Sequence, residues 1–200
     1  MACPSCAVPA QLVVVVVAIL LAAPKLSHVQ PLRHIDISFN MSGRTVVITG
    51  GNSGVGLEAA RDFAGRGASV TLTSRSLERA AATAASLPNS VGMALDLTDP
   101  ASVRAFATAF RAALGDMRLD VLILNAGMVY GPDFRGPYAT AFPGGRVDTM
   151  IAANHLGHFL LLQELLGLVE ASGTRVVFVS SISHHLATRL PRRARSLLHR

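Results

Sequence analysis

Short apolar runs alternate with amphipathic stretches between residues 44 and 180 of this 200-residue chain. Five of the runs have the length of β-strands. The run at 121–124 is wholly apolar, as is typical of a strand that is buried on both faces of a sheet. These runs predict strands at 45–49, 68–73, 91–95, 121–124 and 175–179.

Helical periodicity fills the intervals between the predicted strands. It predicts helices at 54–66, 77–86, 100–114 and 146–171, and a long Gly- and Pro-rich surface loop at 131–145. The third helix has the clearest start, since Thr98 or Asp99 caps it and Pro100 occupies its first turn. Strands that alternate with helical units of this length are joined by right-handed crossovers. The predicted fold class is therefore α/β, a doubly wound parallel sheet with helices on both faces.

The first predicted strand ends in a glycine-rich turn, and a helix pattern follows it at once. In such a turn, Gly50 permits the tight bend, Gly54 lets the backbone approach a pyrophosphate, and Gly56 lets the helix pack closely on the strand. The N-terminus of the helix adds free N–H groups and a partial positive charge. The turn predicts a dinucleotide site that also includes Asn52, Ser53 and Val55. A purely structural turn is the alternative, because Gly-x3-Gly-x-Gly differs from the commoner G-x-G-x-x-G.

The end of the second predicted strand indicates which dinucleotide binds. Proteins that bind NAD usually place an acidic residue about 20 residues beyond the glycine turn, where it holds the ribose 2′-hydroxyl. This chain has Thr73, Ser74 and Arg75 at that point and no acid. An arginine can bind a 2′-phosphate through two hydrogen bonds. We therefore expect NADP(H) as the cofactor in preference to NAD(H); the alternative is that Arg75 is a solvated residue before the next helix.

Five motifs occur in a fixed order along residues 42–186. They are Thr49–Gly56, Leu95-Asp96-Leu97, Asn125-Ala126-Gly127, Asn154–Leu160 and Val176–Ser181. In this order they resemble the short-chain dehydrogenase/reductase family, nearest its branch of retinol-dehydrogenase-like and WW-domain-oxidoreductase-like proteins. The resemblance implies a Rossmann-type, three-layer fold, with about five of the family's seven strands present. It also implies an NADP-dependent oxidoreductase that interconverts carbonyl and alcohol groups on a lipophilic substrate such as a retinoid or steroid.

The resemblance assigns cofactor roles to two of these motifs. Asp96 resembles the aspartate that binds the adenine amino group, with Leu97 beside the ring; the alternative for Asp96 is that it caps the next turn. Asn125, Ala126 and Gly127 resemble the triplet that holds the central sheet and lines the cofactor cleft.

The resemblance also assigns catalytic roles to Asn154 and Ser181. Asn154 resembles the asparagine that kinks its helix and anchors a water molecule of the proton relay, and we expect its amide to be buried and hydrogen-bonded. Ser181 resembles the serine that hydrogen-bonds the substrate carbonyl. His155 and His158 lie one helical turn apart in a packing motif, and no metal site is predicted.

The chain departs from the family in lacking a tyrosine followed four residues later by a lysine. In the family this pair follows the serine and transfers the proton to or from the substrate oxygen. Only 19 residues follow Ser181, none of them Tyr or Lys, and the only lysine is Lys25. We therefore expect residues 1–200 to correspond to the N-terminal part of the family fold, and their activity to be doubtful. The alternatives are a genuine short product that binds NADP or a partner without redox chemistry, and a membrane-associated protein.

The positive charge of the chain is concentrated at its C-terminus. The net charge is +6, yet residues 189–200 contain five arginines and no acid, so the rest of the chain carries only +1. No aromatic residue is interleaved with these arginines, so a nucleic-acid partner is not expected. We treat 187–200 as a basic tail, separate from the predicted dinucleotide-binding domain at 42–186.

The N-terminal segment 1–30 contains twelve uninterrupted apolar residues at 12–23. A full membrane span needs about 20 residues, whereas this length suits a short anchor or the apolar core of a signal peptide. No basic residue precedes the run, while Lys25 and Arg33 follow it, which favours an uncleaved anchor with the domain in the cytosol. We expect association with a membrane of the endoplasmic-reticulum type. The alternative is a cleaved signal in a secreted or organelle-targeted protein.

Overall fold

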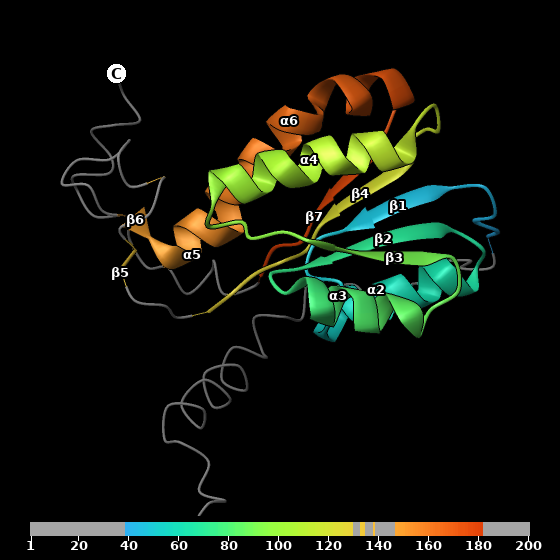
Figure 1. The fold of residues 1–200 in the computed structure, drawn as a ribbon, viewed down its shortest axis with the longest axis horizontal. Helices are drawn as coiled ribbons and strands as arrows, with labels where there is room; N and C mark the ends of the chain where they lie inside the picture. The colour runs from blue at the N-terminus through green and yellow to red at the C-terminus, as the bar shows by residue number, and fades with distance from the viewer. Residues whose placement is uncertain (1–38, 130–132, 135–137, 139–146, 182–200) are drawn as a thin grey trace, which may run out of the picture. The chain divides into compact units, whose positions relative to one another are not determined.

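The computed structural model describes residues 39–129, 133–134, 138 and 147–181 (Figure 1). All helices and strands described below lie in the unit Asn40–Arg200. The expected N-terminal anchor and the basic tail lie outside the described residues. Within the described residues, no helix is both long and apolar enough to cross a membrane.

Five strands form one parallel sheet in the order β3-β2-β1-β4-β7. The strands are β1 (Thr45–Ile48), β2 (Ser69–Ser74), β3 (Ser90–Ala94), β4 (Val121–Leu124) and β7 (Arg175–Phe178). Because β1 pairs with β2 on one side and with β4 on the other, the strand order reverses at β1. Open α/β sheets bind ligands outside the carboxyl ends of the strands at such a reversal.

Helices cover both faces of the sheet. They are α2 (Gly54–Gly65), α3 (Leu77–Ala85), α4 (Pro100–Leu114) and α6 (Gly157–Ser172). In Figure 1, α2 and α3 lie on one face, and α4 and α6 lie side by side on the other. The predicted doubly wound, three-layer fold is therefore confirmed. The predicted strands and the first three helices agree with the structure to within one residue at each end.

The side chains of β1 contribute to two separate apolar clusters. Val46 and Ile48 pack with Ala60 on the face covered by α2 and α3. Val47 packs with Leu161 on the face covered by α4 and α6. Alternate residues of a strand point to opposite faces, so a strand that is covered on both sides needs apolar residues throughout. This is why β1 shows no alternation of apolar and polar residues in the sequence.

The predicted helix at 146–171 is wrong in its first part. The structure has a two-residue strand β6 (Val147–Asp148), a short helix α5 (Thr149–Ile151) and a π-helical turn η3 (Ala152–Leu156) before α6 begins. β6 pairs antiparallel with β5 (Asp133–Phe134), which lies inside the predicted loop. Asp148 explains the delayed start, because its side chain accepts hydrogen bonds from the N–H groups of Met150 and Ile151 and so caps the helix there.

β7 forms one edge of the described sheet and leaves apolar side chains exposed. Phe178 on this strand is 62% exposed, and Phe159 on α6 is 57% exposed. Leu156 and Leu160, in contrast, are half-buried. A β-branched edge strand with exposed apolar residues offers unpaired backbone groups to other strands.

Candidate functional site

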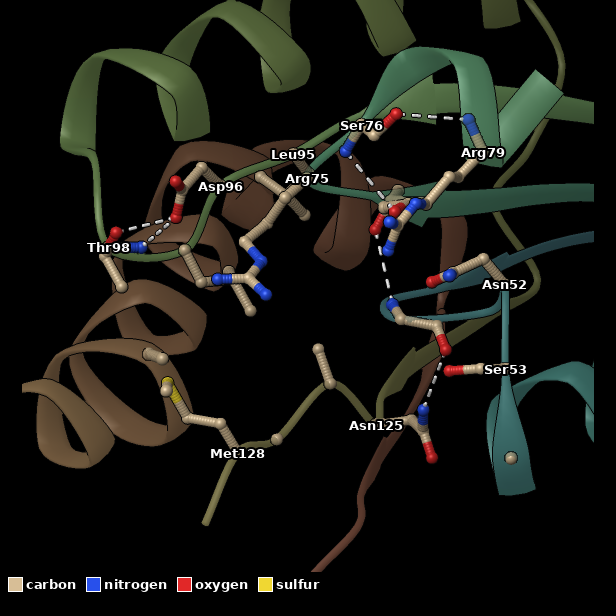
Figure 2. A pocket seen from close by; sticks show the side chains of 18 of the residues that line it. Asn52, Ser53, Arg75, Ser76, Arg79, Leu95, Asp96, Thr98, Asn125 and Met128 are labelled. Carbon is tan, nitrogen blue, oxygen red and sulfur yellow. Dashed lines mark hydrogen bonds between the residues drawn. The ribbon is translucent and has the colours of Figure 1, made fainter. Parts of the chain in front are cut away.

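A cavity of about 850 Å³ opens at the carboxyl ends of β1, β2 and β4, beside the first turns of α2 and α3. Eleven of the fourteen site residues predicted from the sequence line it (Figure 2). These residues are Gly50, Asn52, Ser53, Gly54, Val55, Arg75, Asp96, Leu97, Asn125, Ala126 and Gly127. The structure therefore brings together segments that are up to 77 residues apart, because the parallel strands that precede them end at the same side of the sheet.

The glycine turn at the end of β1 has the conformation and the close contacts that require glycine. Gly50 has φ +67° and Gly54 has φ +55°, in the left-handed region that favours glycine. A Cβ on Gly56 would lie 2.5 Å from the carbonyl oxygen of Gly50 and 2.5 Å from Nδ2 of Asn125. Gly56 does not line the cavity; its role in the structure is the close packing of α2 on the turn.

The first turn of α2 has no side-chain cap. Ser53 stands at the N-cap, but its side chain makes no capping hydrogen bond. In α3, the hydroxyl of Ser76 accepts from the N–H of Arg79, and in α4, the carboxylate of Asp99 accepts from the N–H of Ala101. The first residues of α2 line the cavity, so its N–H groups and positive end are available to an anion there.

Two arginines supply positive charge on the side of the cavity that follows β2. Arg75 comes directly after the strand, and Arg79 lies four residues further on, in the first turn of α3. Both side chains extend toward the interior of the cavity (Figure 2). Among the described residues, neither guanidinium forms an ion pair with a carboxylate. This side of the cavity therefore favours a group with negative charge.

Asp96 combines the two roles that the sequence left open. One oxygen, Oδ1, accepts hydrogen bonds from the backbone N–H of Thr98 at 2.8 Å and from its hydroxyl at 2.7 Å. The carboxylate thus caps the turn that leads into α4. It also lines the cavity together with the buried Leu97.

The segment after β4 is held to the end of β1 by hydrogen bonds. The side-chain amide of Asn125 donates to the carbonyl oxygen of Thr49 at 2.9 Å. The backbone N–H groups of Asn125 and Ala126 both donate to the Thr49 hydroxyl, each at 2.9 Å. Because Thr49 is completely buried, no water competes for these bonds. They fix the position of the cavity-lining residues Asn125 and Ala126 relative to the glycine turn.

Asn154 and Ser181 do not line the cavity. Asn154 is exposed, so the expectation of a buried amide is wrong, although both of its amide atoms are hydrogen-bonded. Its Oδ1 accepts from the N–H of Met128, and its Nδ2 donates to the carbonyl of Met128, each at 2.9 Å. The Asn154 side chain reaches the segment that follows β4, and these two bonds satisfy its amide although the residue is exposed. Ser181 is exposed and follows β7 at the same sheet end as Val179, which does line the cavity.

Tyr138 is the tyrosine that the structure describes, and its environment differs from that of a proton-transfer group. Its ring packs against the buried cluster of Val147 and Ala152, and its hydroxyl is buried without a hydrogen-bond partner among the described residues. Burial raises the pKa of this phenol. Proton exchange near neutral pH needs the opposite shift.

The match of this chain to a family model adds to these observations. Residues 44–189 match the model described as short chain dehydrogenase. The chain belongs to the short-chain dehydrogenase family. All of the described strands and helices fall within the matched residues.

Individual members of the family show the same relationship. The chain is 38% identical to "Retinol dehydrogenase 11" of Homo sapiens over 173 residues, which cover 83% of this chain and 52% of the relative. It is 44% identical to "Dehydrogenase/reductase SDR family member 13" of Homo sapiens over 152 residues, which cover 72% of this chain and 37% of the relative. The chain thus spans about half the length of these relatives, or less.

Solved structures of the family share the fold. The crystal structure of a metagenomic short-chain oxidoreductase in complex with NADP superposes with a TM-score of 0.57 at 33% sequence identity. The alignment covers 71% of this chain and 64% of that chain.

The sequence prediction for this short-chain dehydrogenase omitted several residues of the cavity. Those that line it in addition are Thr73, Ser74, Ser76, Arg79, Leu95, Thr98, Met128, Ala153 and Val179. Arg79 is the next arginine after Arg75, only four positions further along the sequence, and this local cluster of positive charge was the available signal. Ala153 was not detectable, because its position depends on the π-helical turn.

Proposed function

We propose that this short-chain dehydrogenase binds NADP(H) in the cavity at the carboxyl ends of the strands. The observation that carries the proposal is the pair Arg75 and Arg79, which line the cavity with no acid at the end of β2. The two guanidinium groups suit a 2′-phosphate, and an aspartate or glutamate in their place would suit a 2′-hydroxyl. The uncapped first turn of α2 suits the pyrophosphate, and Asp96 and Leu97 suit the adenine.

We further propose that the activity is oxidoreduction between a carbonyl and an alcohol group of a lipophilic substrate. The nicotinamide of the bound cofactor supplies or accepts the hydride in such chemistry. The chain's own contribution is to bind and orient the dinucleotide, and Ser181 would hydrogen-bond the substrate oxygen. The retinol dehydrogenase relatives support a retinoid-like substrate. A membrane anchor at 12–23 would place the domain beside the phase in which such substrates dissolve.

The cofactor proposal is tested by comparing NADPH and NADH binding to the full chain by calorimetry. We expect NADPH to bind more tightly. Replacing Arg75 with alanine should narrow the difference in binding free energy by about 1–3 kcal/mol, because a charge-assisted hydrogen bond is lost. Arg79→Ala should act in the same direction, and NADH binding should change little in either variant.

Arg111 provides the matched control for these substitutions. It is an exposed arginine in the last turn of α4 and does not line the cavity. Arg111→Ala should leave both affinities unchanged. Equal affinities of the unmodified protein for NADPH and NADH would contradict the proposal.

A second candidate, dinucleotide binding without turnover, is favoured by the residues after Ser181. None of them is Tyr or Lys, and the phenol of Tyr138 is buried with its pKa raised. We therefore expect residues 1–200 to oxidise no NADPH with retinaldehyde above the rate of the Ser181→Ala variant, measured by loss of NADPH absorbance. Steady-state turnover that depends on Ser181 would show that the chain contains another proton donor.

A further inference from the structure

Thr49 and His158 form a buried hydrogen-bonded pair between the end of β1 and the first turn of α6. The distance from Oγ1 of Thr49 to Nε2 of His158 is 2.9 Å. The other ring nitrogen of His158, Nδ1, lies 3.2 Å from the carbonyl oxygen of Asn154. Thr49 is 0% and His158 is 4% exposed, so both bonds are shielded from water.

The direction of each bond follows from the number of donors around the Thr49 hydroxyl. A hydroxyl has two lone pairs and one hydrogen. The backbone N–H groups of Asn125 and Ala126 use both lone pairs. The hydrogen then goes to Nε2 of His158 at 2.9 Å or to the carbonyl of Ile123 at 3.5 Å, and the shorter contact has the better geometry.

The same reasoning assigns the tautomer of His158. If Nε2 accepts the hydroxyl hydrogen, the ring proton is on Nδ1, where it donates to the carbonyl oxygen of Asn154. The opposite tautomer would direct three donors at the two lone pairs of Thr49. It would also place the lone pair of Nδ1 against the Asn154 carbonyl. Unsatisfied buried polar groups of this kind are rare because each is costly.

We propose that His158, neutral and protonated on Nδ1, is a positioning residue that holds the segment 125–128 in place. His158 fixes the orientation of the Thr49 hydroxyl, and that hydroxyl receives the N–H groups of Asn125 and Ala126. At the other end of the segment, the side chain of Asn154 binds the backbone of Met128. The first turn of α6 and the π-helical turn before it therefore hold both ends of a segment that lines the cavity.

The consequence for binding rests on the proposed function, because the segment would contact the dinucleotide. A loose segment would present its backbone to the cofactor in many arrangements, and ordering it on binding would reduce affinity. The positioning role itself can be measured without any cofactor.

The first measurement is ¹⁵N NMR of the full chain, labelled at histidine and purified in detergent micelles. The His158 resonances are assigned by their loss in the His158→Gln variant. We expect a protonated Nδ1 and an unprotonated Nε2 near neutral pH. A protonated Nε2 in the unmodified protein would overturn the inference.

The second measurement is amide hydrogen exchange at Asn125 and Ala126. His158→Leu removes the acceptor, and we expect these two amides to exchange about ten-fold faster, the effect of a typical lost hydrogen bond. His158→Gln retains an acceptor near the position of Nε2 and should restore slow exchange. The amide of Leu72 in β2 is the reference, since general destabilisation would accelerate it as well.

Two Thr49 variants complete the test. Thr49→Ser keeps the hydroxyl and should behave as the unmodified protein, whereas Thr49→Val should accelerate the same two amides. Accelerated exchange in Thr49→Val but not in His158→Leu would overturn the role of His158. NADPH affinity should fall in His158→Leu and recover in His158→Gln. If the unmodified protein binds no NADPH, the proposed function fails, and tautomer and exchange alone decide the positioning role.

Discussion

At the scale of single residues, two kinds of side chain shape the cavity: charged residues that line it, and buried residues that hold its lining in place by hydrogen bonds. Arg75 and Arg79 supply charge at one side, and both are exposed. Thr49 and His158 supply support from below the cavity surface, and both are buried. The two groups should respond differently to solution conditions, because exposed charges are screened by salt while buried hydrogen bonds are not.

Burial lowers the pKa of His158 below its ordinary value of 6.5, and the charge of the neighbouring His155 acts in the same direction. The hydrogen bond to the Asn154 carbonyl opposes this shift without reversing it. His158 therefore binds a proton more readily in the unfolded chain than in the folded one. The stability that the neutral ring contributes to the fold is complete above about pH 6.5 and is lost as the pH falls.

We expect the free energy of unfolding to decrease below about pH 6.5, with His158 contributing at most about 1.4 kcal/mol per pH unit. Urea unfolding of the full chain at pH 7.5 and pH 5.5 measures this. The His158→Gln variant, which has no titratable group at this position, should show a smaller decrease. An equal decrease in both proteins would assign the pH dependence to other groups.

At the scale of elements, α6 is positioned by the contact of its first residue with the segment after β3. A Cβ on Gly157 would lie 2.2 Å from the carbonyl oxygen of Leu97 and 2.7 Å from its Cβ. Backbone atoms cannot move aside as a flexible side chain can. The close approach of α6 to the Asp96–Leu97 side of the cavity therefore depends on glycine at this position.

Gly157→Ala should reduce the free energy of unfolding by about 1–3 kcal/mol, as overpacking typically does. Gly167 on the same helix has no atom within 4 Å of an added Cβ, so Gly167→Ala should instead stabilise by about 0.5–1 kcal/mol through helix propensity. Chemical denaturation of the two variants gives both values. If both variants changed the free energy of unfolding in the same direction, the contact between Gly157 and Leu97 would not control the packing of α6.

Elements with strong local signals were predicted accurately. Asp99 and Pro100 define the start of α4, and the observed helix begins at Pro100. The start of α6 was predicted wrongly, because the sequence from 146 onward is compatible with one continuous helix. The π-helical turn coincides with contacts to other elements: the side chain of Asn154 binds Met128, and Gly157 packs on Leu97. Neither contact is visible in the local sequence.

At the scale of the whole molecule, the edge strand β7 is the most exposed part of the described sheet. Phe178 on this strand is 62% exposed, and Val179, the residue after the strand, is 47% exposed. Exposed apolar edges of this kind promote pairing between chains. We therefore expect the purified chain to self-associate.

Phe178→Lys should shift the chain toward the monomer in sedimentation velocity experiments, because a charged residue on an edge strand opposes edge-to-edge pairing. Met117→Lys is the matched control, since Met117 is 57% exposed and lies outside the strands and helices. It should leave the distribution of species unchanged. A monomeric unmodified chain at high concentration would contradict the prediction.

The sequence by itself determined the fold class, nearly all element bounds and eleven residues of the cavity. It did so because buried parallel strands, helix caps and the glycine turn at Gly50–Gly56 are local signals with few alternative explanations. The expected preference for NADP(H) also depended on a local signal, the absence of an acid beside Arg75.

Only the tertiary structure decided how these residues are held. The assignment of the His158 tautomer required the donors around Thr49, which come from residues 76 and 77 positions away. The exposure of Asn154 and the start of α6 likewise depended on contacts between distant segments. Hydrogen-bond directions and close backbone approaches arise from such contacts, and a one-dimensional pattern of apolar and polar residues does not encode them.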